Sequence, residues 1–337
     1  MLYVVTGVAS SADDIFGDLA FQLGSDSSQF LFWIDFKDPS LVGHLRHAVL
    51  GTRSVVCIAP SAVWGGSSVA RSMIAALGYA VEKMSGWDHL MFLSMADIPL
   101  VPTHELEDWV DATRSVDFLG HRWNNWSNEA YKPGHHIIGE PFETYEYRLV
   151  SPRPGVNVMV AHEVAGKFTD PLIRELRLCN ELFERYSVTC TDEIGTDRIY
   201  IYPLSPHVAA LRDDFVARFG WLAGRMWVRL SRRAVESLLS LPISAFLNEV
   251  FATVLIADEC LFQTAMLVLE KTGSGPLEIA WTGYHFNDGT VIDVHPGNFR
   301  GILAARRPHD FFVRKRRRGD RELPAMVNEL VGRRAAG

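Results

Sequence analysis

The stretch that most constrains this chain runs from Trp64 to Leu100 and reads WGGSSVARSMIAALGYAVEKMSGWDHLMFLSMADIPL. A Gly-Gly turn precedes two serines that can cap a helix, and small and apolar residues then recur at helical spacing as far as Gly86. The apolar run at residues 89–94 has the length of a buried strand, and Asp97 follows it. Ligands of open α/β sheets bind beyond the carboxyl ends of strands. The stretch therefore predicts an αβ unit with Asp97 at the ligand edge, a pattern that any α/β enzyme also shows.

The rest of the first third repeats the same alternation. Apolar runs at residues 2–6, 30–34 and 55–59 predict further buried strands, and helical patterns at residues 13–23 and 103–112 alternate with them. This rhythm is typical of a mostly parallel sheet with crossover helices, and thus of the α/β class.

Composition limits the classes of protein that remain. Of the 337 residues 48% are apolar and 22% are charged, as in ordinary globular proteins, and the formal net charge of −7 disfavours a general nucleic-acid binder. No apolar run reaches the ~18 residues of a membrane span, and the N-terminus lacks the basic start of a signal peptide. The four cysteines show no metal-binding spacing, which favours buried free thiols. We expect a cytoplasmic protein.

Two segments differ from the rest of the chain in composition. Basic residues crowd between Arg306 and Arg321, which predicts an anionic partner such as a nucleoside diphosphate or an anionic membrane surface. Residues 121–145 are aperiodic and place Trp123 and Trp126 beside asparagines, a combination that suits a sugar surface. An aromatic-pinned surface loop without a ligand explains the same composition.

Five segments, taken in order, resemble one enzyme family. They are WGG at residues 64–66, LSMADIPL at 93–100, GRMWVRLSRRAVESLL at 224–239, IADECLFQTAML at 256–267 and FFVRKRRRGD at 311–320. Together they resemble the core-2/I-branching N-acetylglucosaminyltransferase and peptide O-xylosyltransferase family, glycosyltransferase family 14. The chain departs from the family pattern at Met95-Ala96, where the family has a Gly-containing pair, and at Ala257, where it has proline.

The resemblance implies a bacterial-type inverting glycosyltransferase with a GT-A-like, Rossmann-related fold and a UDP-sugar donor, with N-acetylglucosamine or xylose favoured. Glu259 corresponds to the family's catalytic base, and Lys315 to the lysine at the donor diphosphate. The chain has no Asp-x-Asp motif, so we expect no metal and no other cofactor, with fixed cations at the diphosphate instead. A helix N-terminus would lower the pKa of Glu259, whereas burial and Asp258 would raise it, and the sequence leaves that balance open.

The remaining site residues are assigned to the two substrates. The donor side comprises Asp35, Trp64, Gly65, Asp97, Arg300, Arg314 and Lys315. The acceptor side comprises Trp123, Trp126, Trp227, Asp258 and Trp281. Plainer interpretations stay open for some of them: a turn aspartate for Asp35, a core residue for Trp281, and ordinary first-turn acids for Asp258 and Glu259. For Arg316 to Arg318 we favour a solvated tail or a membrane-surface patch.

We expect a nucleotide-sugar half at residues 1–120 and an acceptor-binding and catalytic half at residues 121–337, sharing one core. The acceptor is a saccharide or glycolipid used in bacterial polysaccharide synthesis, with peripheral contact at the inner membrane. Oligomeric state is not indicated. Two other classes compete with this interpretation: a non-catalytic sugar- or nucleotide-binding protein on the same fold, and an anionic-surface binder that uses the C-terminal arginines.

Overall fold

The computed structural model describes residues 1–12, 18–60, 62, 67–120, 122–123, 158–164, 167–168, 187–192, 195–203, 214–215, 217–220, 222–242, 257–273, 278–281, 283–286, 292–316, 320 and 322–331.

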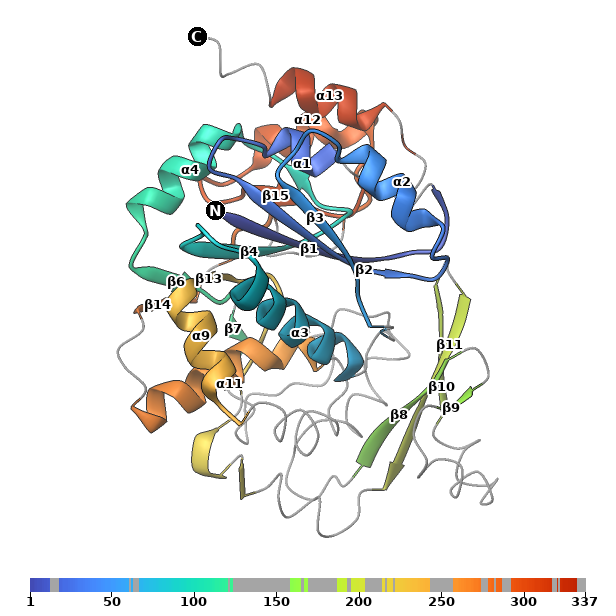
Figure 1. Ribbon diagram of the computed structural model, residues 1–337, viewed down its shortest axis with the longest axis vertical. Helices are drawn as coiled ribbons and strands as arrows, with labels where there is room; N and C mark the ends of the chain where they lie inside the picture. Colours follow the sequence, from blue (N-terminus) through green and yellow to red (C-terminus); the bar gives the residue numbers. More distant parts are fainter. Residues whose placement is uncertain are drawn as a thin grey trace.

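A seven-stranded sheet with the strand order β14-β6-β13-β4-β1-β2-β3 forms the centre of the fold (Figure 1). Its strands are β1 (Leu2–Ala9), β2 (Gln29–Phe36), β3 (Ser54–Ile58), β4 (His89–Ser94), β6 (Val116–Phe118), β13 (Arg229–Ser231) and β14 (Glu278–Ala280). β1 pairs in parallel with β2 and β4, and β13 runs antiparallel between β4 and β6. The sheet is therefore mixed and mostly parallel, which confirms the predicted fold class.

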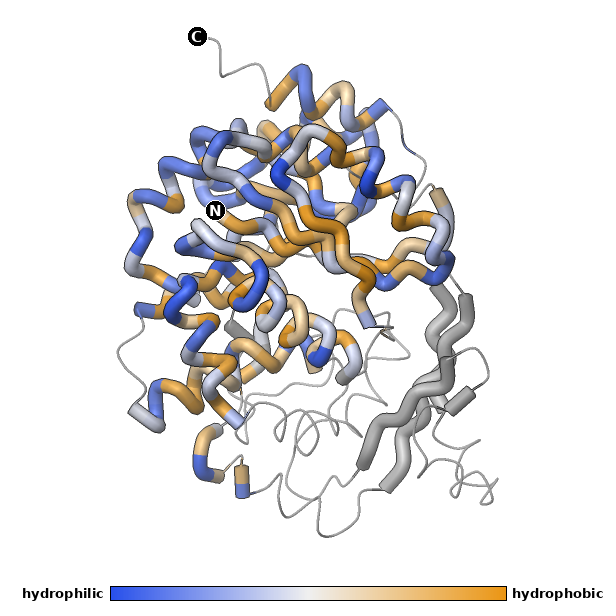
Figure 2. The backbone as a smooth tube through the Cα atoms, viewed as in Figure 1, coloured by the Kyte–Doolittle hydropathy of each residue, from blue (hydrophilic) through white to orange (hydrophobic). Residues whose placement is uncertain are grey.

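The inner strands are buried because their sequences are apolar on both faces. All eight residues of β2 are buried, as are the first four of β1, and Figure 2 shows these strands as the apolar centre of the molecule. Continuous apolar runs of this kind are typical of parallel strands covered on both sides. β3 ends the sheet and is only partly covered, with Ile58 60% exposed. The expectation of buried thiols is confirmed for Cys260 but wrong for Cys57, which lies half-buried on this edge strand.

Helices cover both faces of the sheet. They are α1 (Asp18–Gln22), α2 (Leu41–Ala48), α3 (Ser67–Lys83), α4 (Thr103–Ala112), α9 (Arg232–Ser240), α11 (Asp258–Thr272), α12 (Pro296–Ala305) and α13 (Leu323–Leu330). Figure 1 shows α3, α9 and α11 together on one side, and α1, α2, α12 and α13 on the other. None of the helices in the described part of the chain is long and apolar enough to cross a membrane.

Short ladders tie the peripheral segments to this centre. β5 (Ile98–Pro99) pairs antiparallel with β15 (Phe312–Val313), and β7 (Arg122–Trp123) pairs antiparallel with β12 (Ala223–Gly224). Apolar side chains of β5, β15, α12 and α13 form a second, smaller core. The C-terminal segment is thereby fixed beside the exit of β4.

A separate four-stranded sheet has the order β10-β11-β8-β9. Its strands are β8 (Val158–Val164), β9 (Lys167–Phe168), β10 (Ser187–Asp192) and β11 (Gly195–Pro203). We did not predict these strands, although the alternation in RIYIYP at residues 198–203 is a strand signal.

Several local predictions are confirmed residue by residue. The strand at residues 89–94 and the helix at residues 103–112 have the predicted bounds. The structure also shows that Ser231 caps α9, since its side chain accepts a hydrogen bond of 3.2 Å from the backbone N–H of Ala234. The helix predicted at residues 13–23 is described only as α1, because residues 13–17 lie outside the described residues.

Candidate active site

The site lies at the carboxyl edge of the central sheet. The strand order reverses between β1 and β4, because the chain adds β2 and β3 on one side of β1 and β4 on the other. Ligands of open α/β sheets bind in the crevice at such a switch point. The residues predicted from the ends of strands, Asp35 and Asp97, both lie at this edge.

Asp35 is buried at the end of β2. Its Oδ2 atom accepts hydrogen bonds from Nζ of Lys37 at 2.8 Å and from the backbone N–H of Ala62 at 2.9 Å. The carboxylate thereby holds the chain two residues before Trp64. Trp64 and Gly65 themselves lie outside the described residues. Asp35 anchors the backbone at Ala62, and its contact with a donor stays a prediction.

Asp97 closes the turn after β4. The backbone N–H of Ser94 donates to its Oδ2 and the hydroxyl of Ser94 to its Oδ1, both at 2.8 Å, and Nε2 of His285 lies 3.2 Å from Oδ2. Burial alone would raise the pKa of Asp97, but His285, Arg314 and Ser94 hold it below its ordinary value. Burial lowers the pKa of His285 more than Asp97 raises it. The pair therefore consists of a carboxylate and a neutral imidazole that donates from Nε2.

Trp227 connects this pair to the C-terminal segment. The Trp227 ring is 3% exposed, and its centroid lies 5.1 Å from that of His285. The guanidinium carbon of Arg314 lies 4.5 Å from the centroid of the same indole, a cation–π geometry. Three buried nitrogens here, Trp227 Nε1, His285 Nδ1 and Arg314 Nε, have no hydrogen-bond partner within the described stretches. Buried polar atoms usually have a hydrogen-bond partner, so these three nitrogens could still form hydrogen bonds to a ligand or to water.

Asp258 and Glu259 are the first two residues of α11, where a negative charge interacts favourably with the N-terminal end of the helix dipole. Nη1 of Arg225 lies 3.5 Å from Oε1 of Glu259, and the two side chains are 12% and 16% exposed. Burial, with a smaller contribution from Asp258, raises the pKa of Glu259 to about 8 against the opposing effect of Arg225 and Arg314. Burial likewise raises the pKa of Asp258 to about 6. Burial thus decides the balance that the sequence left open.

The predicted cations lie in different surroundings. Arg314 is half-buried and faces Asp97, Asp258 and Glu259 closely enough to lower the pKa of each. Lys315 is exposed, and its backbone pairs with Ile292. Arg300 is exposed on α12, whose buried side packs into the smaller core.

The aromatic residues predicted to meet the acceptor are only partly placed. Trp281 directly follows β14 and is half-buried against the main core. Trp123 lies in β7, opposite Ala223 of β12, so the backbone of this segment runs beside the residues that lead to Arg225. Trp126 lies outside the described residues.

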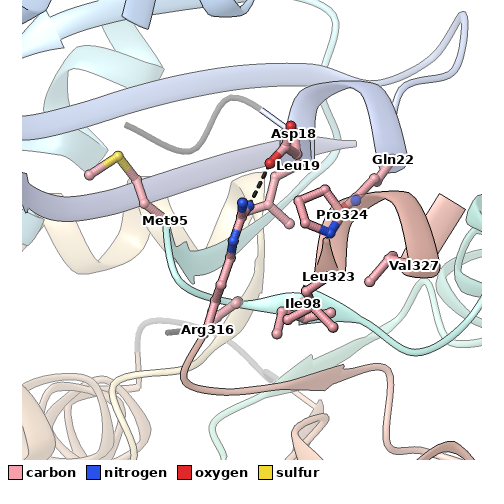
Figure 3. Close-up of a pocket in the computed structure, with 10 residues that line it drawn as sticks. Asp18, Leu19, Gln22, Met95, Ile98, Arg316, Leu323, Pro324 and Val327 are labelled. Carbon is pink, nitrogen blue, oxygen red and sulfur yellow. Dashed lines mark hydrogen bonds and ion pairs between the residues drawn. The ribbon is translucent and has the colours of Figure 1, made fainter. Parts of the chain in front are cut away.

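Arg316 contradicts the expectation of a solvated basic tail. Its guanidinium forms an ion pair with Asp18 and donates to the carbonyl of Asp320, and its side chain is 10% exposed. Figure 3 shows this ion pair in a cavity between α1, β5 and α13. The apolar residues around it, Leu19, Ile98 and Leu323, reduce its access to water, which favours pairing over solvation. Arg317, Arg318 and Arg321 lie outside the described residues.

Two residues of the site were not predicted. Arg225 lies in the G-R-M-W segment, and His285 lies four residues after Trp281. A basic side chain two positions before a tryptophan carries no signal of its own, and an isolated histidine carries little. Among the described residues, no group of three histidine, cysteine, aspartate or glutamate side chains is arranged to hold a metal ion.

The mostly parallel seven-stranded sheet, with acidic and basic side chains gathered at its carboxyl edge, is an α/β fold consistent with the GT-A-like glycosyltransferase architecture. Residues 18–144 match the family model described as Core-2/I-Branching enzyme. No curated protein matches the sequence. The family match confirms the resemblance over those residues and indicates a glycosyltransferase. It includes Asp35 and Asp97 but ends before Arg225, Glu259 and Lys315.

Proposed function

We propose that the protein is an inverting glycosyltransferase that transfers a sugar from a UDP-sugar to a saccharide hydroxyl without a metal ion. The observation that carries the proposal is the position of Glu259. A mostly buried carboxylate, 16% exposed and with a pKa of about 8, lies at the start of α11, with Arg225 at 3.5 Å and Arg314 facing it from the C-terminal segment. An ionised carboxylate with so high a pKa is a strong base for its type.

In the proposed reaction the acceptor hydroxyl attacks the anomeric carbon of the donor sugar, and Glu259 accepts the hydroxyl proton. The bond from the anomeric carbon to the diphosphate oxygen breaks, and UDP leaves with its electron pair. Attack from the face opposite the leaving group inverts the configuration. Because only ionised Glu259 can accept the proton, transfer should increase as pH rises towards about 8.

The departing diphosphate requires positive charge nearby. Lys315 is exposed next to Arg314, which packs on Trp227, so one cation of the pair is free to turn towards a ligand while the other is held in place. Ionised donors aimed at developing negative charge stabilise such a transition state in the way that a metal ion does elsewhere. We assign the diphosphate to Lys315, assisted by Arg314.

The acceptor would approach from the side of β7, β12 and Trp281. We infer a saccharide or glycolipid acceptor in bacterial polysaccharide or glycoconjugate synthesis, with N-acetylglucosamine or xylose as the favoured donor sugar. These substrate identities rest on the family resemblance, and a few pocket residues can change the donor sugar within one fold. The cytoplasmic location and peripheral membrane contact stay predictions.

The test is a thermal-shift screen of nucleotide sugars followed by a transfer assay. A specific donor stabilises the folded state by mass action, so UDP-N-acetylglucosamine or UDP-xylose should raise Tm more than GDP- or CMP-linked sugars do. Glu259→Gln should keep this shift and lose ~10²-fold or more in transfer. Normal turnover by a folded Glu259→Gln variant, or no stabilisation by any nucleotide sugar, would overturn the proposal.

A further inference from the structure

Arg225 lies between β12 and β13 and reaches the start of α11. Its Nη1 atom is 3.5 Å from Oε1 of Glu259, and neither side chain is more than 16% exposed. An ion pair with this little water around it is screened far less than a surface pair. Its effect on the carboxylate therefore depends on how firmly Arg225 is held.

The backbone of Arg225 is fixed from two sides. Nε2 of Gln263 donates to the carbonyl of Arg225 at 2.8 Å and to the carbonyl of Leu119 at 2.7 Å, and Gln263 is completely buried. Gly120, at φ 69°, packs so closely that an added Cβ would lie 3.1 Å from the carbonyl oxygen of Trp227 and 3.3 Å from Cβ of Arg225. The segment around Arg225 thus has little freedom to move.

Both contacts with Arg225 come from one face of α11. Glu259 and Gln263 are four residues apart, so their side chains lie on the same side of the helix. Gln263 holds the backbone of Arg225, and Glu259 meets its guanidinium. The helix that carries the base therefore also sets the position of the cation beside it.

The other charges around Glu259 are arranged differently. Asp258 is its neighbour on α11, and Arg314 faces it from the segment after β15. Arg314 packs on the Trp227 ring and lowers the pKa values of Asp97, Asp258 and Glu259. The neutral His285 packs against Trp227 and is hydrogen-bonded to Asp97. Arg225 forms the ion pair with Glu259 itself.

We propose that Arg225 is a positioning residue for Glu259, which holds Oε1 of the carboxylate and favours its ionised form. The inference rests on the proposed role of Glu259 as the general base. In this arrangement Oε1 remains with Arg225, and Oε2 takes the proton of the acceptor hydroxyl. Loss of Arg225 should leave Glu259 protonated to higher pH.

The experiment measures the titration of Glu259 directly and then through activity. Protein labelled with ¹³C at the glutamate carboxyl carbons is titrated by NMR, and the signal absent from Glu259→Gln identifies the residue. Arg225→Met, which keeps the length of the stem, should raise the midpoint of this signal by about one pH unit or more. The acid limb of the kcat/KM profile should move in the same direction, with an ionised fraction about tenfold lower at neutral pH.

Two further variants separate positioning from general destabilisation. Arg225→Lys keeps a charge and should restore most of both shifts, although a point charge replaces a planar group. Arg218→Gln removes an exposed arginine from an ion pair with Asp214 and should change neither. If Arg225→Met does not fold, Arg225→Gln provides the neutral replacement.

The outcomes distinguish this inference from the function on which it rests. A raised midpoint in a protein that transfers no sugar supports the positioning of Glu259 and rejects the proposed reaction. Active enzyme with an unchanged midpoint and an unchanged acid limb in the neutral Arg225 variants overturns the positioning role. Equal losses of activity at every pH, not restored by Arg225→Lys, would also overturn it.

Discussion

The carboxylate of Asp97 and the imidazole of His285 meet at 3.2 Å, although 188 positions of sequence separate them. Asp97 follows β4, the central strand of the seven-stranded sheet, and His285 follows β14, which forms one edge of that sheet. Their side chains are 0% and 2% exposed. Through Trp227 and Arg314 this buried pair supports the side of the site that faces Glu259. The pair should therefore contribute to the stability of the fold.

Removal of the imidazole should destabilise the fold. His285→Ala leaves a buried carboxylate without one of its donors, at a cost of about 2–4 kcal/mol in the free energy of unfolding. His285→Gln retains an N–H donor and should cost less. Urea unfolding of both variants measures the effect, with the exposed His309→Ala as the control.

The pH dependence of that cost has a definite sign. The pKa of His285 is lowered in the folded protein, so below the ordinary value of 6.5 the unfolded chain binds a proton that the folded chain resists. The stabilising contribution of His285 is therefore present at neutral pH and is lost in acid. The difference between wild type and His285→Gln should shrink as pH falls below 6.5. A difference that grows in acid would contradict the neutral state of His285.

Glu259 should destabilise the folded protein at alkaline pH. Its folded pKa of about 8 exceeds the ordinary 4.5, so stability is present below that ordinary value and is lost as pH rises to about 8. Glu259→Gln removes this loss, and its advantage over wild type should be small near pH 4.5 and largest above pH 8. Urea unfolding across this range measures it, with Glu236→Gln, which breaks an exposed ion pair, as the control. If Glu259→Gln were more stable than wild type by the same amount at every pH, the pKa of Glu259 would not be raised in the folded protein.

Lys315 should contribute to donor binding and to transfer together. Lys315→Ala removes a cation from the diphosphate and should weaken UDP binding about tenfold or more, while kcat also falls. Lys315→Arg should restore only part, and the exposed Lys271→Ala serves as the control. Titration calorimetry with UDP and steady-state kinetics give the two quantities. Unchanged UDP affinity in Lys315→Ala would remove this lysine from the donor site.

Transfer should not require a divalent ion. We expect activity to survive excess EDTA and to change little when Mn²⁺ is added, because the diphosphate is assigned to basic side chains. The comparison is made on the same preparation before and after chelation. Loss of activity in EDTA and recovery with Mn²⁺ would refute the metal-independent mechanism.

Trp281 should act on the acceptor more than on the donor. If the indole packs against the acceptor sugar, Trp281→Ala raises the acceptor KM well above any change in the donor KM, and Trp281→Phe retains part of the contact. Kinetics with each substrate varied in turn decide between the two roles. Parallel losses of Tm and of both affinities would instead identify an ordinary core residue.

Local pattern accounts for the elements that could be predicted. The strand at residues 89–94 and the helix at residues 103–112 follow from hydrophobic periodicity, and the cap that Ser231 provides for α9 is a local feature of the same kind. These features are decided within a few residues of chain, by burial of one face and by capping of backbone N–H groups. The period-two alternation of RIYIYP in β11 is a local strand signal of the same kind.

Long-range contacts account for what could not be predicted. Asp97, Asp258, Glu259 and Arg314 are candidate site residues in the sequence, but the sequence does not show that they lie close together. Arg225 and His285 matter only because α11 and the exit of β4 lie beside them. In the sequence Arg316 is part of a basic run that favours a solvated tail, and only the structure shows that it pairs with Asp18 in a cavity.

The sequence by itself determined the α/β class and the positions of the main strands, since both depend on residue type and spacing along the chain. Glu259 became a candidate base only through the resemblance to a known family. The tertiary structure decided the state of that carboxylate. A helix N-terminus favours an ionised glutamate, but burial at the start of α11 outweighs it and raises the pKa to about 8. Burial depends on every segment that packs around Glu259, from Arg225 to Arg314, and no stretch of sequence contains that information alone.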